Sequence, residues 1–214
     1  MKPQRLGMLA ATLLAAALLL PATQAWAGPG HVNFTFGQKM FDKDDWSPIE
    51  KQTDYGAEAA FGPAAWPVQM AAYLERASGE KSKEVQSTLG SMTEVNVNAT
   101  TTEAGFGLNK TFSVKLFRPY LGAGLVYTKT DITVSQSGTS TSDHANGFGI
   151  WGGAGAFYRI GPSFNFGGGV RYSKATVDYT AFEGQEISYP ATDVAAGGFA
   201  LHVLIGWSWP KNAQ

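Results

Sequence analysis

The sequence contains no cysteine and few charged residues. Without cysteine a fold held by disulfides is excluded, so stability must come from the packing of secondary structure. Charged residues make up 15% of the chain, whereas about 25% is usual in soluble domains. The 16 basic and 17 acidic residues nearly cancel, and nucleic-acid-binding domains are instead recognised by a basic excess. We therefore expect no nucleic-acid partner.

Long hydrophobic runs are also scarce, and the one clear run lies near the N-terminus. Lys2 and Arg5 precede the apolar residues 6–20, and Ala25-Trp26-Ala27 follows. This order of charged, apolar and small residues is typical of a secretory signal peptide, whereas the alternative, a spanning anchor, needs about 20 apolar residues. We predict a signal peptide over 1–27, cleaved after Ala27 following export by the Sec route, and one mature domain over 28–214.

Glycine and aromatic residues are abundant by contrast. The 26 glycines, 13 phenylalanines, eight tyrosines and six tryptophans suit an all-β protein with aromatic belts. In residues 199–209 every second position from Phe199 to Trp209 is apolar, and alternate side chains of a strand share one face. Taken alone, this apolar face fits a soluble β-core as well as a lipid bilayer.

Turn residues divide the mature chain into eight strand-like runs. Short breaks that contain proline alternate with longer polar stretches, which we predict to be loops. Short turns at one end and long loops at the other are typical of outer-membrane barrels, with both chain ends in the periplasm. The runs cover 31–41, 53–62, 67–78, 93–110, 119–134, 145–159, 163–180 and 192–209, and the predicted loops cover 42–52, 79–92, 135–144 and 181–191.

The two faces of these runs differ in polarity. One face is apolar, as at Phe34, Leu125 and Phe148, and the other carries polar residues and glycines. A small soluble barrel fills its interior with apolar side chains, so a polar interior inside an apolar exterior favours a membrane barrel. We predict an all-β fold, an eight-stranded antiparallel up-and-down transmembrane β-barrel. The predicted aromatic residues at the membrane interface are Trp207, Trp209, Tyr158 and Tyr172.

The predicted interior contains charged residues among many glycines. A buried charge must be paired or hydrated, so we predict that Arg171 lies near at least one of the inward glutamates. Two interpretations of the lumen stay open: aromatic side chains such as Tyr73 and Trp151 fill it, or a narrow hydrated path crosses it. The predicted polar network of the lumen consists of Lys39, Glu58, Glu75, Glu103, Arg171 and His202.

Catalytic patterns are weak. A nucleophilic serine must lie within hydrogen-bonding reach of its base, but His202 and Ser208 are roughly 20 Å apart along a strand. His144 lies beside Asp143 in a predicted serine-rich loop, which leaves a lipid A-modifying enzyme as the least favoured alternative. We predict that the protein is not an enzyme and has no cofactor and no catalytic residue.

An acidic segment opens the first predicted loop. Asp42, Asp44 and Asp45 resemble the start of a calcium loop. Trp46 and Ser47, however, occupy the positions at which such a loop needs a ligand and a glycine. We therefore predict a surface acidic turn and no metal site.

The signal peptide, the eight alternating runs and the aromatic-rich end Phe199 to Trp209 resemble the small eight-stranded outer-membrane barrels of the OmpA, OmpX and OmpW type, including opacity-like proteins. The resemblance covers residues 28–214 and implies a location in the outer membrane of a Gram-negative cell, in contact with its lipids and lipopolysaccharide. It also implies insertion by the barrel-assembly machinery, and we expect a monomer. The function expected is a narrow pore or uptake route for small molecules. The alternative is an envelope-stabilising or surface-interaction, adhesin-like barrel with a plugged lumen.

Overall fold

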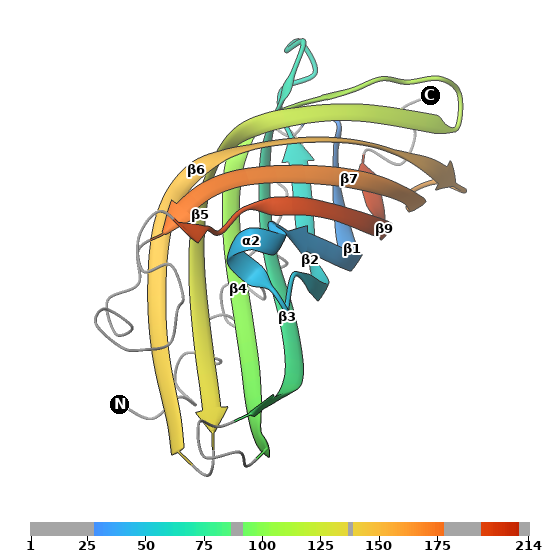
Figure 1. Cartoon of the computed structure of the whole chain (residues 1–214). Helices are drawn as coiled ribbons and strands as arrows, with labels where there is room; N and C mark the ends of the chain where they lie inside the picture. The colour runs from blue at the N-terminus through green and yellow to red at the C-terminus, as the bar shows by residue number, and fades with distance from the viewer. Residues whose placement is uncertain (1–27, 87–91, 137–138, 178–193, 210–214) are drawn as a thin grey trace, which may run out of the picture.

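The computed structural model describes residues 28–86, 92–136, 139–177 and 194–209. The predicted signal peptide over 1–27 and the predicted loop over 181–191 lie outside the described residues. The elements are β1 (Gly30–Phe41), α2 (Lys43–Trp46), β2 (Lys51–Phe61), β3 (Gln69–Gln86), β4 (Met92–Thr111), β5 (Phe117–Gln136), β6 (Thr139–Ile160), β7 (Phe164–Val177), β8 (Val194–Ala195) and β9 (Gly198–Trp209) (Figure 1).

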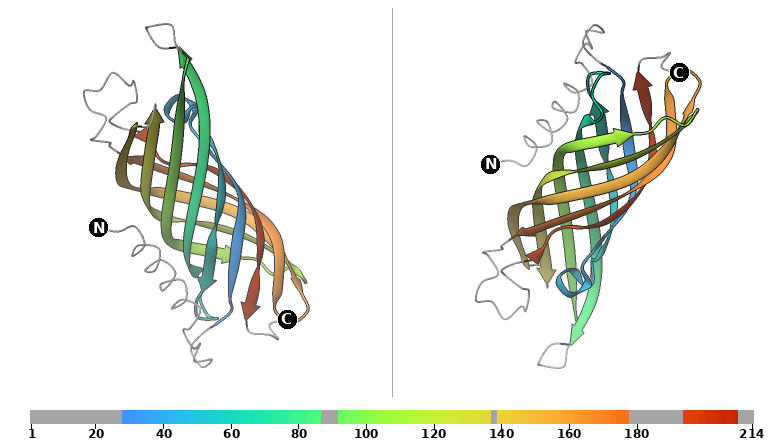
Figure 2. Two further views of the ribbon diagram at one scale, coloured as in Figure 1. Left: turned by 90° about the horizontal axis from the view of Figure 1, so that it is seen from below. Right: turned by 90° about the horizontal axis from the view of Figure 1, so that it is seen from above.

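Eight of the strands close into an antiparallel barrel. Each strand from β1 to β7 pairs with the next along the chain, β7 pairs with β9, and β9 pairs with β1. The two-residue β8 pairs with the end of β7, so β8 and β9 together correspond to the predicted run 192–209. Figure 2 shows the tilted strands of the closed sheet. The predicted eight-stranded up-and-down architecture is therefore confirmed.

Two predicted loops are wrong. Residues 79–86 belong to β3 and continue its pairing with β4, and β5 and β6 pair as far as Gln136 and Thr139. Figure 1 shows β3 to β6 as the longest strands. Serine, threonine, glutamate and lysine made these segments resemble loops. The inward side chains of Val97, Ala99, Ile132 and Val134 are buried, and the strand pairing continues past them to Gln86 and Gln136, which extends both hairpins.

The barrel wall has the predicted polarity. Large apolar side chains point outward and are exposed, among them Leu125 at 69% and Phe148 at 78%. The alternate positions point inward and are buried, and many of them are polar. An exposed apolar belt around a polar interior is the arrangement expected of a barrel surrounded by lipid.

An apolar cluster closes one end of the interior, on the side of the long hairpins. The side chain of Trp46 is 1% exposed, its ring centroid lies 4.4 Å from that of Phe41, and its Nε1 donates a hydrogen bond to the Ala195 carbonyl at 2.5 Å. We call this set of side chains the apolar cap. It consists of Phe41, Trp46, Ile49, Ala77, Val97, Ala99, Ile132, Val134, Ala145, Val177, Val194 and Ala196.

The short helix α2 carries Trp46 into this cap. Asp42 caps its N-terminus, because the side chain accepts a hydrogen bond from the backbone N–H of Asp44 at 2.9 Å. Asp45 accepts another from the backbone N–H of Ala195 at 2.8 Å. The acidic residues thus fix α2 over the barrel end. Within the described ranges, no helix has the length and apolar character needed to cross a membrane.

We predict that Trp46→Ala destabilises the barrel by about 3–5 kcal/mol, because it removes a buried indole and leaves a cavity in the cap. Urea unfolding in detergent micelles measures the change. Trp66→Ala is the matched control: Trp66 is 52% exposed, so its removal should cost less than about 0.5 kcal/mol. Equal effects of the two substitutions would contradict the role assigned to the cap.

Candidate functional site

The candidate site is the interior of the barrel wall. All six residues of the predicted lumen network are buried. Each projects from a different strand, and the strands that supply them are β1, β2, β3, β4, β7 and β9. Their alternation with outward apolar residues explains why each points inward, since successive side chains of a strand face opposite sides.

Arg171 lies at the centre of this interior. Its Nη2 is 2.7 Å from Oε2 of Glu58, and its Nη1 forms an ion pair with Oε1 of Glu75. The guanidinium also lies over the Tyr73 ring, with Cζ 3.9 Å from the ring centroid. The predicted proximity of Arg171 to a glutamate is confirmed. One cation thereby pairs with two carboxylates and stacks on an aromatic face, which is the geometry that favours arginine over lysine.

A second buried pair joins β1 to β4. Lys39 forms an ion pair with Glu103, and both side chains are at most 2% exposed. Ser173 donates a hydrogen bond to Oε1 of Glu103 at 2.9 Å, and Tyr73 donates one to Oε2 at 3.3 Å. Tyr73 therefore connects this pair to Arg171. Such additional hydrogen bonds are needed if a buried ion pair is to offset the loss of hydration.

His202 has a partner that the sequence did not identify. Its Nε2 lies 2.7 Å from Oδ2 of Asp54 and 3.3 Å from Oε1 of Glu75. Asp54 and His202 flank the same residue of β1, because Gly37 pairs with Asp54 on β2 and with His202 on β9. Only the register of three strands brings these two side chains together. A charged residue at an inward position was the available signal for Asp54.

A chain of polar side chains runs from Glu58 toward the other end of the barrel. Asn33 donates to Glu58 Oε1 at 3.1 Å, Asn165 donates to Asn33 Oδ1 at 3.1 Å, and Ser208 donates to Asn165 Oδ1 at 2.8 Å. These residues alternate inward in the sequence, but their order of contact depends on strand register. The network is therefore longer than the six predicted residues.

The inward glycines provide space for aromatic rings. A Cβ on Gly105 would lie 1.9 Å from the Tyr73 ring, and one on Gly155 or Gly169 would lie 2.7 Å from the Tyr120 hydroxyl. Trp151 meets Tyr73 edge to face with centroids 5.2 Å apart. These contacts favour the filled lumen among the two interpretations that the sequence left open.

Little free volume remains beside this network. A cavity of about 20 Å³ lies between residues that include Tyr73, Tyr120, Trp151, Arg171 and His202. Such a volume holds about one water molecule. This cavity therefore has room for an isolated water rather than for a passing solute.

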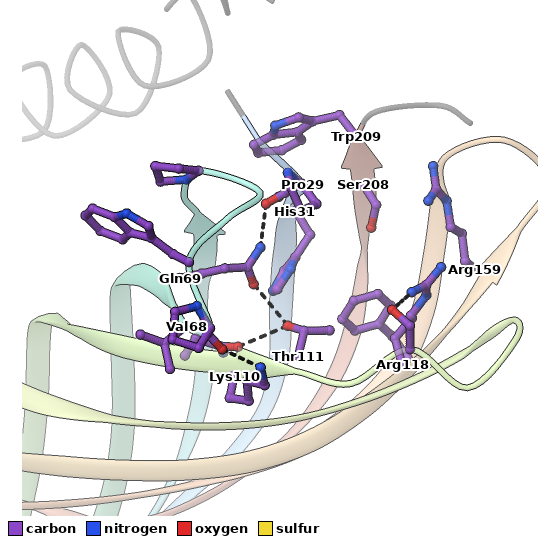
Figure 3. Close-up of a pocket in the computed structure, with 17 residues that line it drawn as sticks. Pro29, His31, Val68, Gln69, Lys110, Thr111, Arg118, Arg159, Ser208 and Trp209 are labelled. Atoms are coloured by element: carbon purple, nitrogen blue, oxygen red, sulfur yellow. Dashed lines mark hydrogen bonds between the residues drawn. The ribbon is translucent and has the colours of Figure 1, made fainter. Parts of the chain in front are cut away.

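A larger hollow of about 230 Å³ lies at the end opposite the apolar cap (Figure 3). Gln69 links two of its walls, because it donates to the Pro29 carbonyl at 2.5 Å and accepts from Thr111 Oγ1 at 3.2 Å. Arg159 lies on its far wall and donates to the Pro162 carbonyl. The hollow is the opening of the barrel at this end, and it is lined by turns and strand ends.

The four predicted interface aromatics lie in two settings. Tyr158, Tyr172 and Trp207 are outward and 56%, 55% and 47% exposed. Trp209 is half-buried at the rim of the hollow, against Gly30 of the paired strand β1 (Figure 3). Their placement at a membrane interface stays a prediction.

His144 lies in β6 and not in the predicted serine-rich loop. His144 is exposed on the outer face opposite Asp131, and Ser142 lies two residues away on the same face. Residues two apart on one strand face are separated by roughly 6.8 Å. This extended backbone holds Ser142 and His144 farther apart than a nucleophile and its base.

The comparisons with known proteins agree with the architecture. A family model described as outer membrane protein beta-barrel domain matches residues 8–205. No curated protein sequence matches the chain. Among solved structures, Ail of Yersinia pestis in complex with the heparin analogue sucrose octasulfate is 11% identical, with a TM-score of 0.51, over 85% of this chain and 99% of Ail.

Two further structures show the same likeness. OprG of Pseudomonas aeruginosa is 15% identical, with a TM-score of 0.51, over 86% of this chain and 97% of OprG. A major outer membrane protein of Thermus thermophilus is 11% identical, with a TM-score of 0.51, over 85% of this chain and 98% of its own. At these identities the likeness shows a common fold.

We predict that Arg171→Met destabilises the barrel by about 3–5 kcal/mol, because it leaves Glu58 and Glu75 buried without their cation. Urea unfolding in micelles measures the loss. Lys129→Met provides the matched control, since the Lys129–Asp131 pair is 3.3 Å long and exposed and should contribute less than about 1 kcal/mol. A stable Arg171→Met barrel would show that the interior network does not hold the wall together.

Proposed function

Because the chain belongs to the outer membrane protein beta-barrel family, and thus lies in the outer membrane in contact with its lipids and lipopolysaccharide, we propose that it is a non-enzymatic barrel with a plugged lumen. Its long hairpins act at the cell surface, where they stabilise the envelope or contact other surfaces. The observation that carries this proposal is the filled interior.

Two layers obstruct the lumen. The first is the network around Arg171, in which Tyr73 and Trp151 occupy the space beside the ion pairs. The second is the apolar cap at the hairpin end. A solute crossing the barrel would have to displace buried ion pairs and then an apolar cluster, and separating a buried pair leaves a charge without compensation. These two layers support a barrel with a plugged lumen rather than a barrel that acts as a narrow pore.

The hairpins supply a surface outside the membrane. On β5, Tyr127 is the last large apolar side chain on the outer face, and the strand continues to Gln136, roughly 30 Å farther along the strand. Beyond the belt the outer face carries polar residues such as Lys129 and Asp131, while the inner face becomes apolar. This inversion is the pattern of a β-structure surrounded by water.

Charge in these hairpins is mixed. Residues 79–84 contain two glutamates, two lysines, a glycine and a serine, and Lys129 pairs with Asp131. The sulfated ligand of the Ail complex is strongly anionic, and a mixed surface gives no reason to assign such a ligand here. The proposal therefore concerns the surface and not a named ligand.

Biogenesis follows from the same fold. We propose export by the Sec route with cleavage after Ala27, insertion by the barrel-assembly machinery, and a monomeric final state. Closure between β1 and β9 supports the monomer, since a closed barrel leaves no free wall edge for a second copy.

We predict that the refolded protein is impermeable to small solutes. In planar bilayers it should give no conductance steps, and liposomes that contain it should not swell in arabinose. The triple variant Trp46→Ala, Tyr73→Ala, Trp151→Ala should admit ions, because it removes rings from both the apolar cap and the network beside Arg171. Conductance steps or liposome swelling with the wild-type protein would overturn the plug and restore the pore.

We also predict that the hairpin end faces the outside of the cell. The natural chain has no cysteine, so single cysteines report position without background. In intact cells Thr133→Cys should react with a membrane-impermeant maleimide, while Ala64→Cys, in the turn at the opposite end, should react only after lysis. The reverse labelling pattern would place the hairpins in the periplasm and contradict the proposal.

A further inference from the structure

Three side chains of the lumen form a compact cluster of metal-ligating groups. Asp54 from β2, Glu75 from β3 and His202 from β9 each offer one ligand atom, and these atoms lie within 4.8 Å of one another. All three side chains are at most 4% exposed. We propose that Asp54, Glu75 and His202 bind a divalent transition-metal ion, with Zn²⁺ as the probe, and that this ion ties three strands of the barrel together.

The geometry is close to that of a coordination site. Zn²⁺ takes imidazole nitrogen and carboxylate oxygen at about 2.0–2.2 Å, so tetrahedral ligands lie roughly 3.3–3.5 Å apart. His202 Nε2 and Glu75 Oε1 are 3.3 Å apart, whereas His202 Nε2 and Asp54 Oδ2 are 2.7 Å apart. Of these two pairs the second must open, by roughly 0.6–0.8 Å, when the ion replaces its hydrogen bond. The ligand atoms of Asp54 and Glu75 lie within 4.8 Å of each other.

Unpartnered oxygens provide an independent observation. Oδ1 of Asp54 and Oε2 of Glu75 are buried and have no hydrogen-bond partner among the residues that the structure describes. A buried carboxylate oxygen without a partner is costly. The other oxygens, Asp54 Oδ2 and Glu75 Oε1, contact His202 and Arg171. Because a carboxylate can ligate through one oxygen or both, a bound ion would take the free oxygens as ligands beside or in place of these.

The charge of the network also favours a cation. Four carboxylates, those of Asp54, Glu58, Glu75 and Glu103, share this part of the lumen with two cations, Lys39 and Arg171. With a neutral imidazole the network has two excess negative charges, and a divalent ion balances both. Carboxylates with one imidazole suit zinc and manganese rather than copper(I), which prefers thiolate or thioether ligands.

Gly37 makes the site possible. It lies between Asp54 and His202 on β1, so no side chain separates their ligand atoms. A Cβ at this position would lie 1.8 Å from the Leu201 carbonyl oxygen. The glycine therefore serves both the close pairing with β9 and the meeting of the two ligands.

The ion would enter during folding, since the apolar cap and the aromatic rings enclose the cluster on both sides. The test accordingly uses the full chain, exported and extracted from outer membranes in detergent. It is unfolded in urea with EDTA, then refolded with ZnSO₄ and freed of loose metal. Metal content is measured by mass spectrometry, and folding is verified by heat-modifiable gel mobility.

We predict a single tightly held zinc ion per wild-type barrel and a higher midpoint of thermal unfolding than without metal. Asp54→Asn and His202→Gln preserve side-chain shape, and each should weaken zinc affinity by more than the roughly 10- to 100-fold that the loss of an outer partner costs. His144→Gln, which removes an exposed histidine, should retain zinc and so controls for surface binding.

Cobalt(II) gives a second readout that needs no variant. Wild-type protein refolded with Co²⁺ should show visible absorption bands of four- or five-coordinate cobalt, which Zn²⁺ abolishes by displacement. A folded wild-type barrel without stoichiometric zinc and without these bands would overturn the site. Unchanged zinc affinity in folded Asp54→Asn would overturn it as well. Because permeability is measured separately, failure of the metal site would leave the plugged barrel standing.

Discussion

Twelve residue pairs join β1 to β9, from Gly30 and Trp209 to Phe41 and Gly198, and close the sheet on itself. The closure gives every wall strand two partners, so the backbone is satisfied without water, as a bilayer requires. The same register aligns Gly37 with His202 on one side, while pairing with β2 aligns it with Asp54 on the other. The interior network therefore depends on how the first and last strands meet.

The apolar face of strand β5 changes from the outside to the inside of the barrel along its length. Along β5, Leu125 faces outward in the apolar belt, while Ile132 and Val134 face inward and form part of the apolar cap. The period of two is constant, but the apolar face changes sides where the surroundings change from lipid to water. Polarity within a strand thus marks the boundary between the membrane and the surface hairpins. The surface function proposed for these hairpins depends on that boundary.

Glycine and aromatic residues act together inside the wall. Gly105, Gly155 and Gly169 allow Tyr73 and Tyr120 to approach the backbone of the wall closely, and the rings in turn occupy interior space. Eight-stranded barrels are just wide enough for side chains to fill them. A lumen rich in glycine is therefore no sign of an open channel when large rings project from neighbouring strands. The proposed plug rests on the same packing that holds the charged network.

Local alternation determined much of this structure. It predicted the outward apolar face and the inward position of Arg171, because successive side chains of a strand alternate regardless of its neighbours. The number of wall strands was predicted instead from the turn residues between the runs. It failed at residues 79–86 and 139–144, whose polar side chains resemble loops although their backbones continue the pairing of β3 with β4 and of β5 with β6.

The tertiary structure alone decided which inward groups meet. Asp54 and His202 are 148 residues apart in the sequence and form a contact only because three strands align in one register. In the same way, Arg171 forms ion pairs with Glu58 and Glu75. Lys39 forms its ion pair with Glu103. Register and side-chain conformation arise from contacts across the whole sheet, so no short segment of the sequence encodes them.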